Sequence, residues 1–500
     1  MPSTRHLSTA LLLLCLLPGQ QQAGETDKIL LPDMGDSSGS LITPIEEQEL
    51  GAAFYRSLQG QLRINQDSEV HDYIQSIGQR LAANSDAPGS SFYFFVVLDQ
   101  AINAFAGPGG YIGINSGLIL NTESESELAS VMAHEIAHVT QRHLYRAFES
   151  ASRMSLPTAA AMLAAILIGT QSPQLGQAAL MAIQAGSLQQ RINFTRSNEQ
   201  EADRVGMQTL VQAHYDPRSM PTFFERLQQS SRYYGRGVPE FLRTHPVTVS
   251  RIADTRGRAE TYPYKQYPDS QAYRLIKAKL LIMTTNNLKD LRNYFHSLEK
   301  QGTAEQRAAA RYGLGLIHAQ NQQFDAARQI FSALHKAFPD QSHYLTALAR
   351  IAFETRDYQQ ALRLYHQARR RHPDNKGIEL EYISALLKSG RAEQAREILL
   401  PLAHTKNRNP VIYRLLAEAY GALDQQAESH RYMAEYYYAM GQPQQAIIQA
   451  KLAKNSRDVN FYLAAILDER LNSLSPKKSN VKSSNSRNGQ ITRTAQQYHH

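Results

Sequence analysis

Cysteine is almost absent from this 500-residue sequence, which contains only Cys15. That residue lies in a short apolar run near the N-terminus, which follows the basic Arg5 and ends at Pro18 and Gly19. The pattern is typical of a secretory signal peptide, and Ala23 offers a small residue for cleavage. The mature chain would then contain no cysteine. This absence excludes disulfide bonds, cysteine-ligated zinc sites and a cysteine nucleophile.

Long hydrophobic runs are also missing, because no stretch reaches the roughly 20 apolar residues that a membrane-spanning helix needs. An Ala-rich apolar stretch at 156–168 is too short to cross a bilayer. It predicts either a buried helix or a lid that covers a cleft and touches a membrane, and we favour the buried helix.

Acidic residues are missing from 471–500, whereas that segment has five basic residues and so carries more than half of the net charge of +8. Such a segment is more typical of a solvated, disordered tail than of a nucleic-acid patch. No nucleic-acid-binding motif accompanies it, so we expect no nucleic-acid partner.

The motif His134-Glu135-Ile136-Ala137-His138 follows a run of good helix formers at 127–133. Residues i and i+4 of a helix lie on one face, so the two imidazoles converge on one point with Glu135 beside them. This geometry predicts a catalytic zinc site, in which the histidines bind the metal and Glu135 is the general base.

The segment upstream of this motif predicts β-structure. Residues 91–98 are aromatic and β-branched, and 102–112 contains two strand-like pieces around a Gly/Pro turn. An edge strand beside a metal site would let an extended peptide add as one more strand, with Asn103, Ala104 and Phe105 as candidate substrate-binding residues. The alternative is an ordinary structural hairpin, in which Asn103 only shapes the turn.

A zinc site with two histidines needs a third protein ligand, and glutamate is one of the residues that serve. Glu201 lies far enough beyond His138 for a second helix to return across the first. The chemistry of Asp203 suits it to orient a ligand histidine through its free ring nitrogen. The alternative is an ordinary charged helix start.

Together, the motifs at 103–112, 134–138 and 198–206 resemble the gluzincin family of HtpX and the CAAX prenyl endopeptidases. The resemblance implies one Zn²⁺ ion per chain with three protein ligands: His134, His138 and Glu201. It also implies that Glu135 acts as base and acid on the attacking water. Members of that family are integral membrane proteins, whereas this chain lacks spans. We therefore expect a soluble, exported branch.

Thr244-His245-Pro246 followed by Arg251 also resembles that family. His245 has two competing roles. It either stabilises the developing oxyanion or occupies the fourth zinc position and holds the enzyme latent. Arg251 either supports the oxyanion or pairs with a nearby acid. Outside the family context, a His-Pro step is often only a turn.

A repeat with a period of 34 residues begins after about residue 270, as the spacing of Ala327, Ala361 and Ala395 shows. This period, with small residues where helices meet, is the signature of tetratricopeptide repeats. We expect four to six helix pairs between 271 and 455, with a concave peptide-binding groove.

These features predict a mostly α protein, in which an α+β zincin metalloprotease domain precedes an α-solenoid of tetratricopeptide repeats. The expected boundaries are a signal peptide at 1–23, the protease domain at 24–265, the repeats at 271–456 and a basic, disordered tail at 457–500.

The combination resembles a bacterial family of periplasmic zinc metalloendopeptidases with chaperone-like activity. By that resemblance the chain would promote assembly of outer-membrane β-barrel proteins and degrade misassembled ones. Its repeats would dock on the barrel-assembly machinery, and peripheral membrane contact is left open. The alternative is a chaperone or adaptor of that machinery whose protease site is largely latent.

Overall fold

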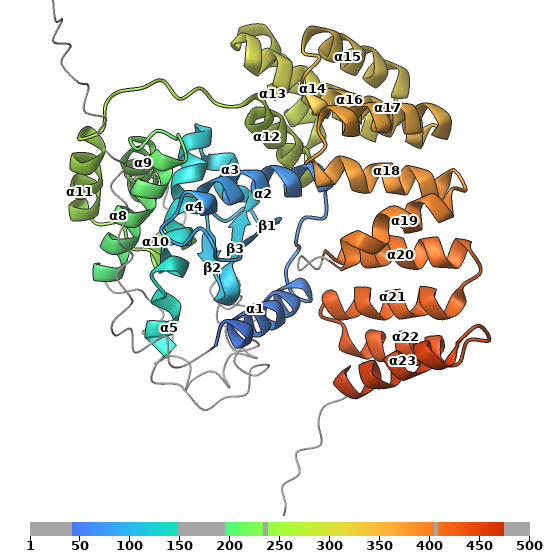
Figure 1. Ribbon diagram of the computed structural model, residues 1–500. Helices are drawn as coiled ribbons and strands as arrows, with labels where there is room; N and C mark the ends of the chain where they lie inside the picture. The colour runs from blue at the N-terminus through green and yellow to red at the C-terminus, as the bar shows by residue number, and fades with distance from the viewer. Residues whose placement is uncertain (1–42, 149–195, 234–238, 405–408, 475–500) are drawn as a thin grey trace, which may run out of the picture.

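The computed structural model describes residues 43–148, 196–233, 239–404 and 409–474 (Figure 1). The expected signal peptide, the Ala-rich stretch at 156–168 and the end of the expected tail lie outside the described residues. No helix in the described ranges is both long and apolar enough to cross a membrane.

The first half of the chain forms an α+β unit, as expected. Its elements follow in this order: α1 (Pro44–Gln59), α2 (Ser68–Ala83), β1 (Tyr93–Val97), β2 (Ala104–Ala106), the 3-10 turn η2 (Pro108–Gly110), β3 (Tyr111–Asn115), α3 (Ser116–Asn121), α4 (Glu125–Thr140), α5 (His143–Phe148), α8 (Arg196–Gln212), α9 (Ser219–Tyr233), α10 (Glu240–Thr244) and α11 (Val249–Glu260).

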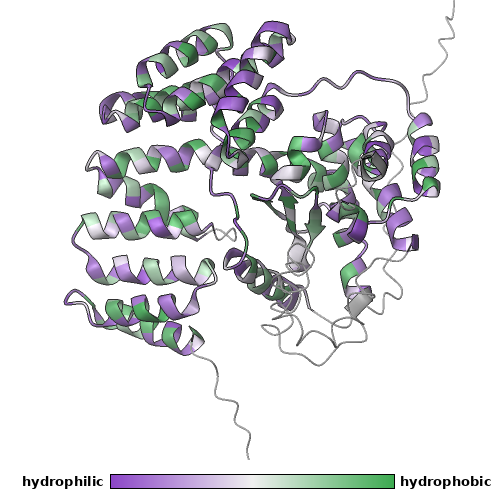
Figure 2. Cartoon of the chain, turned by 180° about the vertical axis from the view of Figure 1, so that it is seen from behind, coloured by the Kyte–Doolittle hydropathy of each residue, from purple (hydrophilic) through white to green (hydrophobic). Residues whose placement is uncertain are grey.

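The three strands form one sheet in the order β1-β3-β2. β3 runs parallel to β1 and antiparallel to β2, with Phe105 opposite Gly113. The tight strand pair expected at 102–112 is therefore present, and its turn is made by η2, where Gly109 has a φ of 67°. The strands are among the most hydrophobic elements of the chain (Figure 2).

Helix α4 lies in the centre of this unit. The Ser124 side chain caps its N-terminus by accepting a hydrogen bond from the Glu127 N–H at 3.2 Å. Every residue from Glu125 to His138 is buried, because the sheet, α2, α8 and α9 pack around α4. A helix covered on all sides can hold polar side chains away from water, and the motif at 134–138 lies on this helix.

The second half of the chain is a succession of helix pairs, which confirms the predicted solenoid (Figure 1). The helices are α12 (Gln271–Thr284), α13 (Leu288–Gln301), α14 (Ala304–Gln320), α15 (Phe324–Ala337), α16 (Ser342–Glu354), α17 (Tyr358–Arg371), α18 (Lys376–Lys388), α19 (Ala392–Ala403), α20 (Pro410–Ala422), α21 (Gln426–Ala439), α22 (Pro443–Lys454) and α23 (Phe461–Leu474).

The predicted end of the repeats at residue 456 is wrong, because α23 continues the array into the segment expected to be disordered. Leu463 and Leu467 of α23 are buried against Ala427 and Ala453 of the preceding helices. The two leucines are four residues apart, so they form one apolar face that the last repeat covers.

The α+β unit and the repeats are joined through α12, which packs on both of them. Tyr273, Ile276 and Leu280 of α12 belong to the core around α4. Leu275 and Ala278 of the same helix belong to the core of the first repeats. One helix thus contributes opposite faces to two hydrophobic cores.

Candidate active site

The centre of the site is a buried group of four side chains: His134, His138, Glu199 and His245. Each of them offers one ligand atom, and these atoms all lie within 4.8 Å of one another. Helix α4 supplies the two histidines of the motif, whose Nε2 atoms are 3.0 Å apart. Glu135 lies on the same helix with only 1% of its surface exposed.

Glu199 of α8 brings the carboxylate to this group. Its oxygens lie 3.5 Å from the Nε2 atoms of both His134 and His138. Helix α8 packs closely on α4 because Gly206 has no side chain. A methyl group at Gly206 would lie 3.0 Å from the Ala133 carbonyl oxygen.

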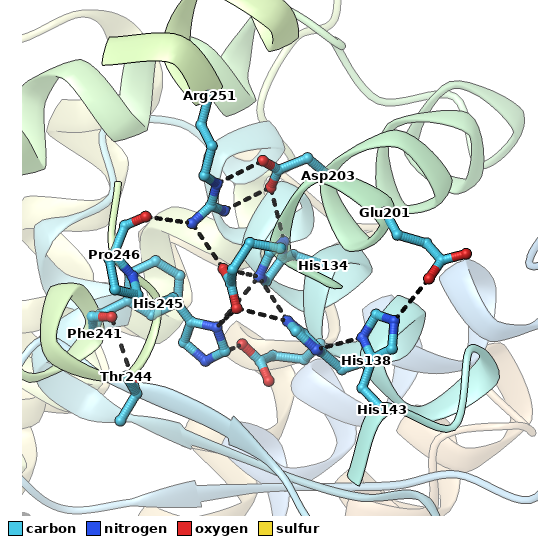
Figure 3. A network of polar contacts seen from close by, with 12 residues as sticks. His134, His138, His143, Glu201, Asp203, Phe241, Thr244, His245, Pro246 and Arg251 are labelled. Carbon is cyan, nitrogen blue, oxygen red and sulfur yellow. Dashed lines mark hydrogen bonds and ion pairs between the residues drawn. The ribbon is translucent and has the colours of Figure 1, made fainter. Parts of the chain in front are cut away.

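The prediction that Glu201 is the third ligand is wrong. Its carboxylate lies outside the buried group, 3.1 Å from His143 Nε2 (Figure 3). The same carboxylate lies 3.3 Å from Arg146. The physical reason is helical phase. Residues two apart on a helix point about 200° apart, so Glu199 and Glu201 cannot face the same cluster.

Asp203 lies where its predicted orienting role requires. Its Oδ1 is 3.0 Å from His134 Nδ1, on the side of the ring away from the other ligand atoms. Arg251 donates to both Asp203 oxygens at 2.7 Å, and its Nη1 lies 2.7 Å from Glu199. Of the two roles considered for Arg251, pairing with nearby acids is the one that these contacts favour.

His245 follows α10, and its N–H donates to the Phe241 carbonyl oxygen at 2.7 Å. This turn directs the imidazole into the cluster. Its Nδ1 lies 3.0 Å from Glu199 Oε1, and its Nε2 lies 3.5 Å from Glu135 Oε1. The expectation that His245 reaches the metal region agrees with this geometry.

Burial and charge act in opposite directions on these groups. Burial alone would lower the pKa of His134, but the carboxylates of Asp203 and Glu199 outweigh it and raise that pKa to about 9. Burial raises the pKa of Glu135, as suits a proton acceptor. Burial together with the neighbouring His134 ring lowers the pKa of His138 well below its usual range. The site therefore concentrates ionisable groups whose charges depend on one another.

The edge of the sheet borders this site. β2 is an edge strand, and among the described strands only β3 pairs with it. Asn103, Ala104 and Phe105 are at most 5% exposed as whole residues. A peptide that adds to an edge strand pairs with the backbone of that strand. The Asn103 Oδ1 atom makes no hydrogen bond with a described residue. The substrate-binding role of these residues stays a prediction.

The donor set fits a zinc ion. Imidazole and carboxylate are the ligand types that zinc accepts when cysteine is absent. The pairing of His134 Nδ1 with Asp203 is the outer contact that metal-bound histidines usually make. The chemistry of the residues thus agrees with a catalytic metal centre.

Two residues of the site were missed by the sequence analysis, namely Glu199 and His143. Glu199 had a usable signal, because it lies four residues before Asp203 and therefore on the same face of α8. His143 had none, because its position depends on a left-handed residue, Arg142, with a φ of 54°.

Comparison with known proteins agrees with this geometry. Residues 68–259 match peptidase family M48, and residues 295–351 and 352–419 match tetratricopeptide repeats. The chain is 35% identical over 444 residues to the beta-barrel assembly-enhancing protease of Escherichia coli. This aligned region covers 89% of this chain and 91% of that protein. The protein of the same name from Yersinia pestis is 34% identical over 410 residues, covering 81% of this chain and 84% of that protein.

A more distant relative matches a smaller part of the chain. The mitochondrial metalloendopeptidase OMA1 of Schizosaccharomyces pombe is 30% identical over 181 residues, which is 36% of this chain and 50% of that protein. This chain is a metalloprotease, and it belongs to the family of the beta-barrel assembly-enhancing proteases, in which an M48 peptidase domain precedes tetratricopeptide repeats.

Proposed function

We propose that this chain is a periplasmic zinc metalloendopeptidase that promotes assembly of outer-membrane β-barrel proteins and degrades misassembled ones. The observation that carries the enzymatic part is the buried group of two imidazoles and the Glu199 carboxylate, with Glu135 beside it. The names of the bacterial relatives support the cellular part. The signal-peptide pattern at the N-terminus supports export.

The proposed ligands of one zinc ion are His134, His138 and Glu199, with Asp203 holding the first histidine in its orientation. A bound zinc ion would supply Lewis acidity to a peptide carbonyl and to the attacking water. Glu135 accepts the proton of the attacking water and later delivers it to the leaving amine. As an edge strand, β2 would align an extended substrate by backbone hydrogen bonds.

The test is the substitution Glu135→Gln in the full-length protein. The amide keeps the size of the side chain but cannot accept the proton, so we expect unchanged zinc content and loss of cleavage by at least about 100-fold. Zinc is measured by elemental analysis, and cleavage is measured on an unfolded protein substrate. Cleavage at the normal rate by Glu135→Gln would refute the assignment.

A second candidate function is a chaperone or adaptor whose protease site is largely latent. The position of His245, which adds a fourth side chain to the ligand group, favours it. The repeats favour it as well, because such arrays bind proteins. Complementation separates the two functions. A Glu135→Gln strain with a fully intact outer-membrane barrier favours the chaperone, and a defective barrier favours the protease.

A further inference from the structure

The two histidines of the motif are supported in different ways on their outer sides. Each directs Nε2 toward the ligand group, so each has Nδ1 on the far side. Asp203 lies against Nδ1 of His134. At His138 the described residue that lies in this place is His143, with its Nδ1 2.9 Å from His138 Nδ1.

The hydrogens of this contact follow from the proposed metal site, on which this inference rests. A histidine that binds a metal through Nε2 carries its proton on Nδ1. His138 therefore donates to His143 Nδ1, which must be unprotonated. His143 then carries its proton on Nε2, which lies 3.1 Å from Glu201 Oε2. The three side chains form one directed chain of hydrogen bonds that ends on a carboxylate (Figure 3).

The backbone is arranged to place His143 here. Helix α4 ends at Thr140, and continuing it would turn residue 143 about 140° away from His138. Arg142 instead adopts the left-handed conformation, with a φ of 54°, and α5 starts directly after it. This turn brings the His143 ring back beside His138, where it is fully buried. A costly conformation at a non-glycine residue is retained where the surrounding structure requires it.

Glu201 is held at the other end of the chain. Arg146 Nη1 lies 3.3 Å from the same carboxylate oxygen that contacts His143. The Glu201 side chain is 29% exposed, whereas the Asp203 side chain is 1% exposed. Helix α8 therefore supports both motif histidines, one directly through Asp203 and the other from the opposite side through Glu201 and His143.

The geometry points to His143 and Glu201 as a positioning pair that fixes the tautomer and orientation of His138 in the metal site. Neither residue contacts the metal in this assignment. Both act through His138, as outer partners of metal ligands do. Glu201 thus belongs to the site, although in a different role from the one first predicted.

The experiment measures how fast zinc leaves the full-length protein when an excess of a chromogenic chelator is added. His143→Ala removes the acceptor, and we expect zinc release to become about 10- to 100-fold faster. With His143→Asn we expect zinc release to return most of the way to the wild-type rate, because the asparagine Oδ1 takes the place of the histidine Nδ1 as acceptor. Glu201→Ala accelerates release about tenfold, and Glu201→Gln does so less, because its amide oxygen still accepts from His143. The visible spectrum of the cobalt-substituted protein should change in the same order.

The matched control is His343→Ala, which removes a buried histidine of α16 in the repeats and should leave zinc release unchanged. Normal release from both His143→Ala and Glu201→Ala would overturn the inference. Should His143→Ala fail to fold, the two Glu201 variants decide, because that side chain is partly exposed. A wild-type protein that takes up no zinc would overturn the proposed function together with this inference, whereas unaffected variants of a zinc-binding protein overturn the inference alone.

Discussion

His245 is the single residue whose position matters most for access to the site. Catalytic zinc sites keep one coordination position open, whereas structural sites are closed by four protein ligands. The imidazole of His245 lies within the ligand group and is 2% exposed. We infer from this arrangement a resting state in which the proposed metal would have four protein ligands.

We therefore predict that His245→Ala increases cleavage of an unfolded protein. If the closed state holds about 90% of the molecules, opening the site permanently raises the initial rate by about tenfold. Zinc content should stay near one per chain, because three ligands remain. The double variant with Glu135→Gln serves as the inactive control. A rate reduced by about 100-fold or more would instead assign His245 to oxyanion stabilisation.

The sequence predicted two of the three proposed metal ligands and Glu135, because the spacing of the motif at 134–138 determines its geometry once it lies on a helix. Glu201 was predicted as the third ligand because glutamate is a suitable ligand type and the family resemblance implied this position. Only the phase of α8 relative to α4 distinguishes Glu199 from Glu201, and this phase depends on tertiary packing. The predicted role of Asp203 would have indicated the correct phase, since a residue that contacts His134 must lie on the same face of α8 as the metal ligand.

At the level of helices, the site depends on how closely α8 approaches α4. Gly206 lies at a close contact, since a methyl group there would lie 3.0 Å from the Ala133 carbonyl oxygen and 3.1 Å from His134 Cα. Both neighbours are backbone atoms, which cannot rotate away. A side chain at this position would have to move the helix that holds Glu199 and Asp203.

We predict that Gly206→Ala lowers kcat/KM about tenfold while the free energy of unfolding falls by only about 1 kcal/mol. Alanine improves helix propensity by about 1 kcal/mol, which offsets part of an overpacking cost of about 1–3 kcal/mol. The displaced ligands explain the larger effect on activity. Chemical denaturation and a peptide-cleavage assay measure the two quantities.

The matched control is Gly257→Ala in α11, where a methyl group would meet no atom within 4 Å. This variant should gain about 0.5–1 kcal/mol of stability and keep full activity. Equal activities for the two alanine variants would show that the close approach at Gly206 does not position the ligands.

The elements themselves were largely predictable, because their periodicity is a local property. The strand pair around Gly109 and the repeat helices appear where the pattern placed them. Helix α23 was missed because it has no repeat motif and is followed by the basic tail. Its stability depends on burial of Leu463 and Leu467 against the preceding repeat, which only the assembled array provides.

At the scale of the whole molecule, α12 attaches the repeats to the protease by buried polar contacts as well as by its apolar faces. Lys279 of α12 lies 2.5 Å from Glu69 and 2.7 Å from Asp67 at the start of α2, and Lys279 is 5% exposed. A buried cation of this kind is strongly destabilising once its partners are removed. The array is therefore held in one orientation relative to the active site.

A cavity of about 1000 Å³ separates two parts of the molecule. Helix α2 and strand β1 line one side, the repeats from α17 to α20 line the other, and Tyr93 and Asp72 are among the lining residues. Helices α2 and α18 meet beside it, where Asp72 Oδ1 accepts a hydrogen bond from the Lys376 N–H at 3.1 Å. Repeats and protease thus face one another across a shared space. The strength with which they are joined determines whether that space can widen.

Asp72 makes this junction sensitive to pH. Burial raises its pKa to about 6, although hydrogen bonds from the Lys376 and Gly377 N–H groups oppose that change. The folded protein holds this proton more tightly than the unfolded chain does. The stabilisation that protonated Asp72 contributes is therefore fully present below about pH 4, and it is lost as the pH rises through about 6.

We predict that Asp72→Asn raises the free energy of unfolding by about 1–2 kcal/mol at pH 8. This range already allows for the part of the side chain that water still reaches. The amide oxygen still accepts from Lys376, but the cost of burying a charge is gone. At pH 4 the variant and the wild type should unfold at nearly the same temperature. Calorimetry of both proteins at pH 4 and pH 8 measures this, and the pH 4 comparison is the control. A gain of equal size at both pH values would show that packing, and not ionisation of Asp72, limits how firmly the repeats dock on the protease.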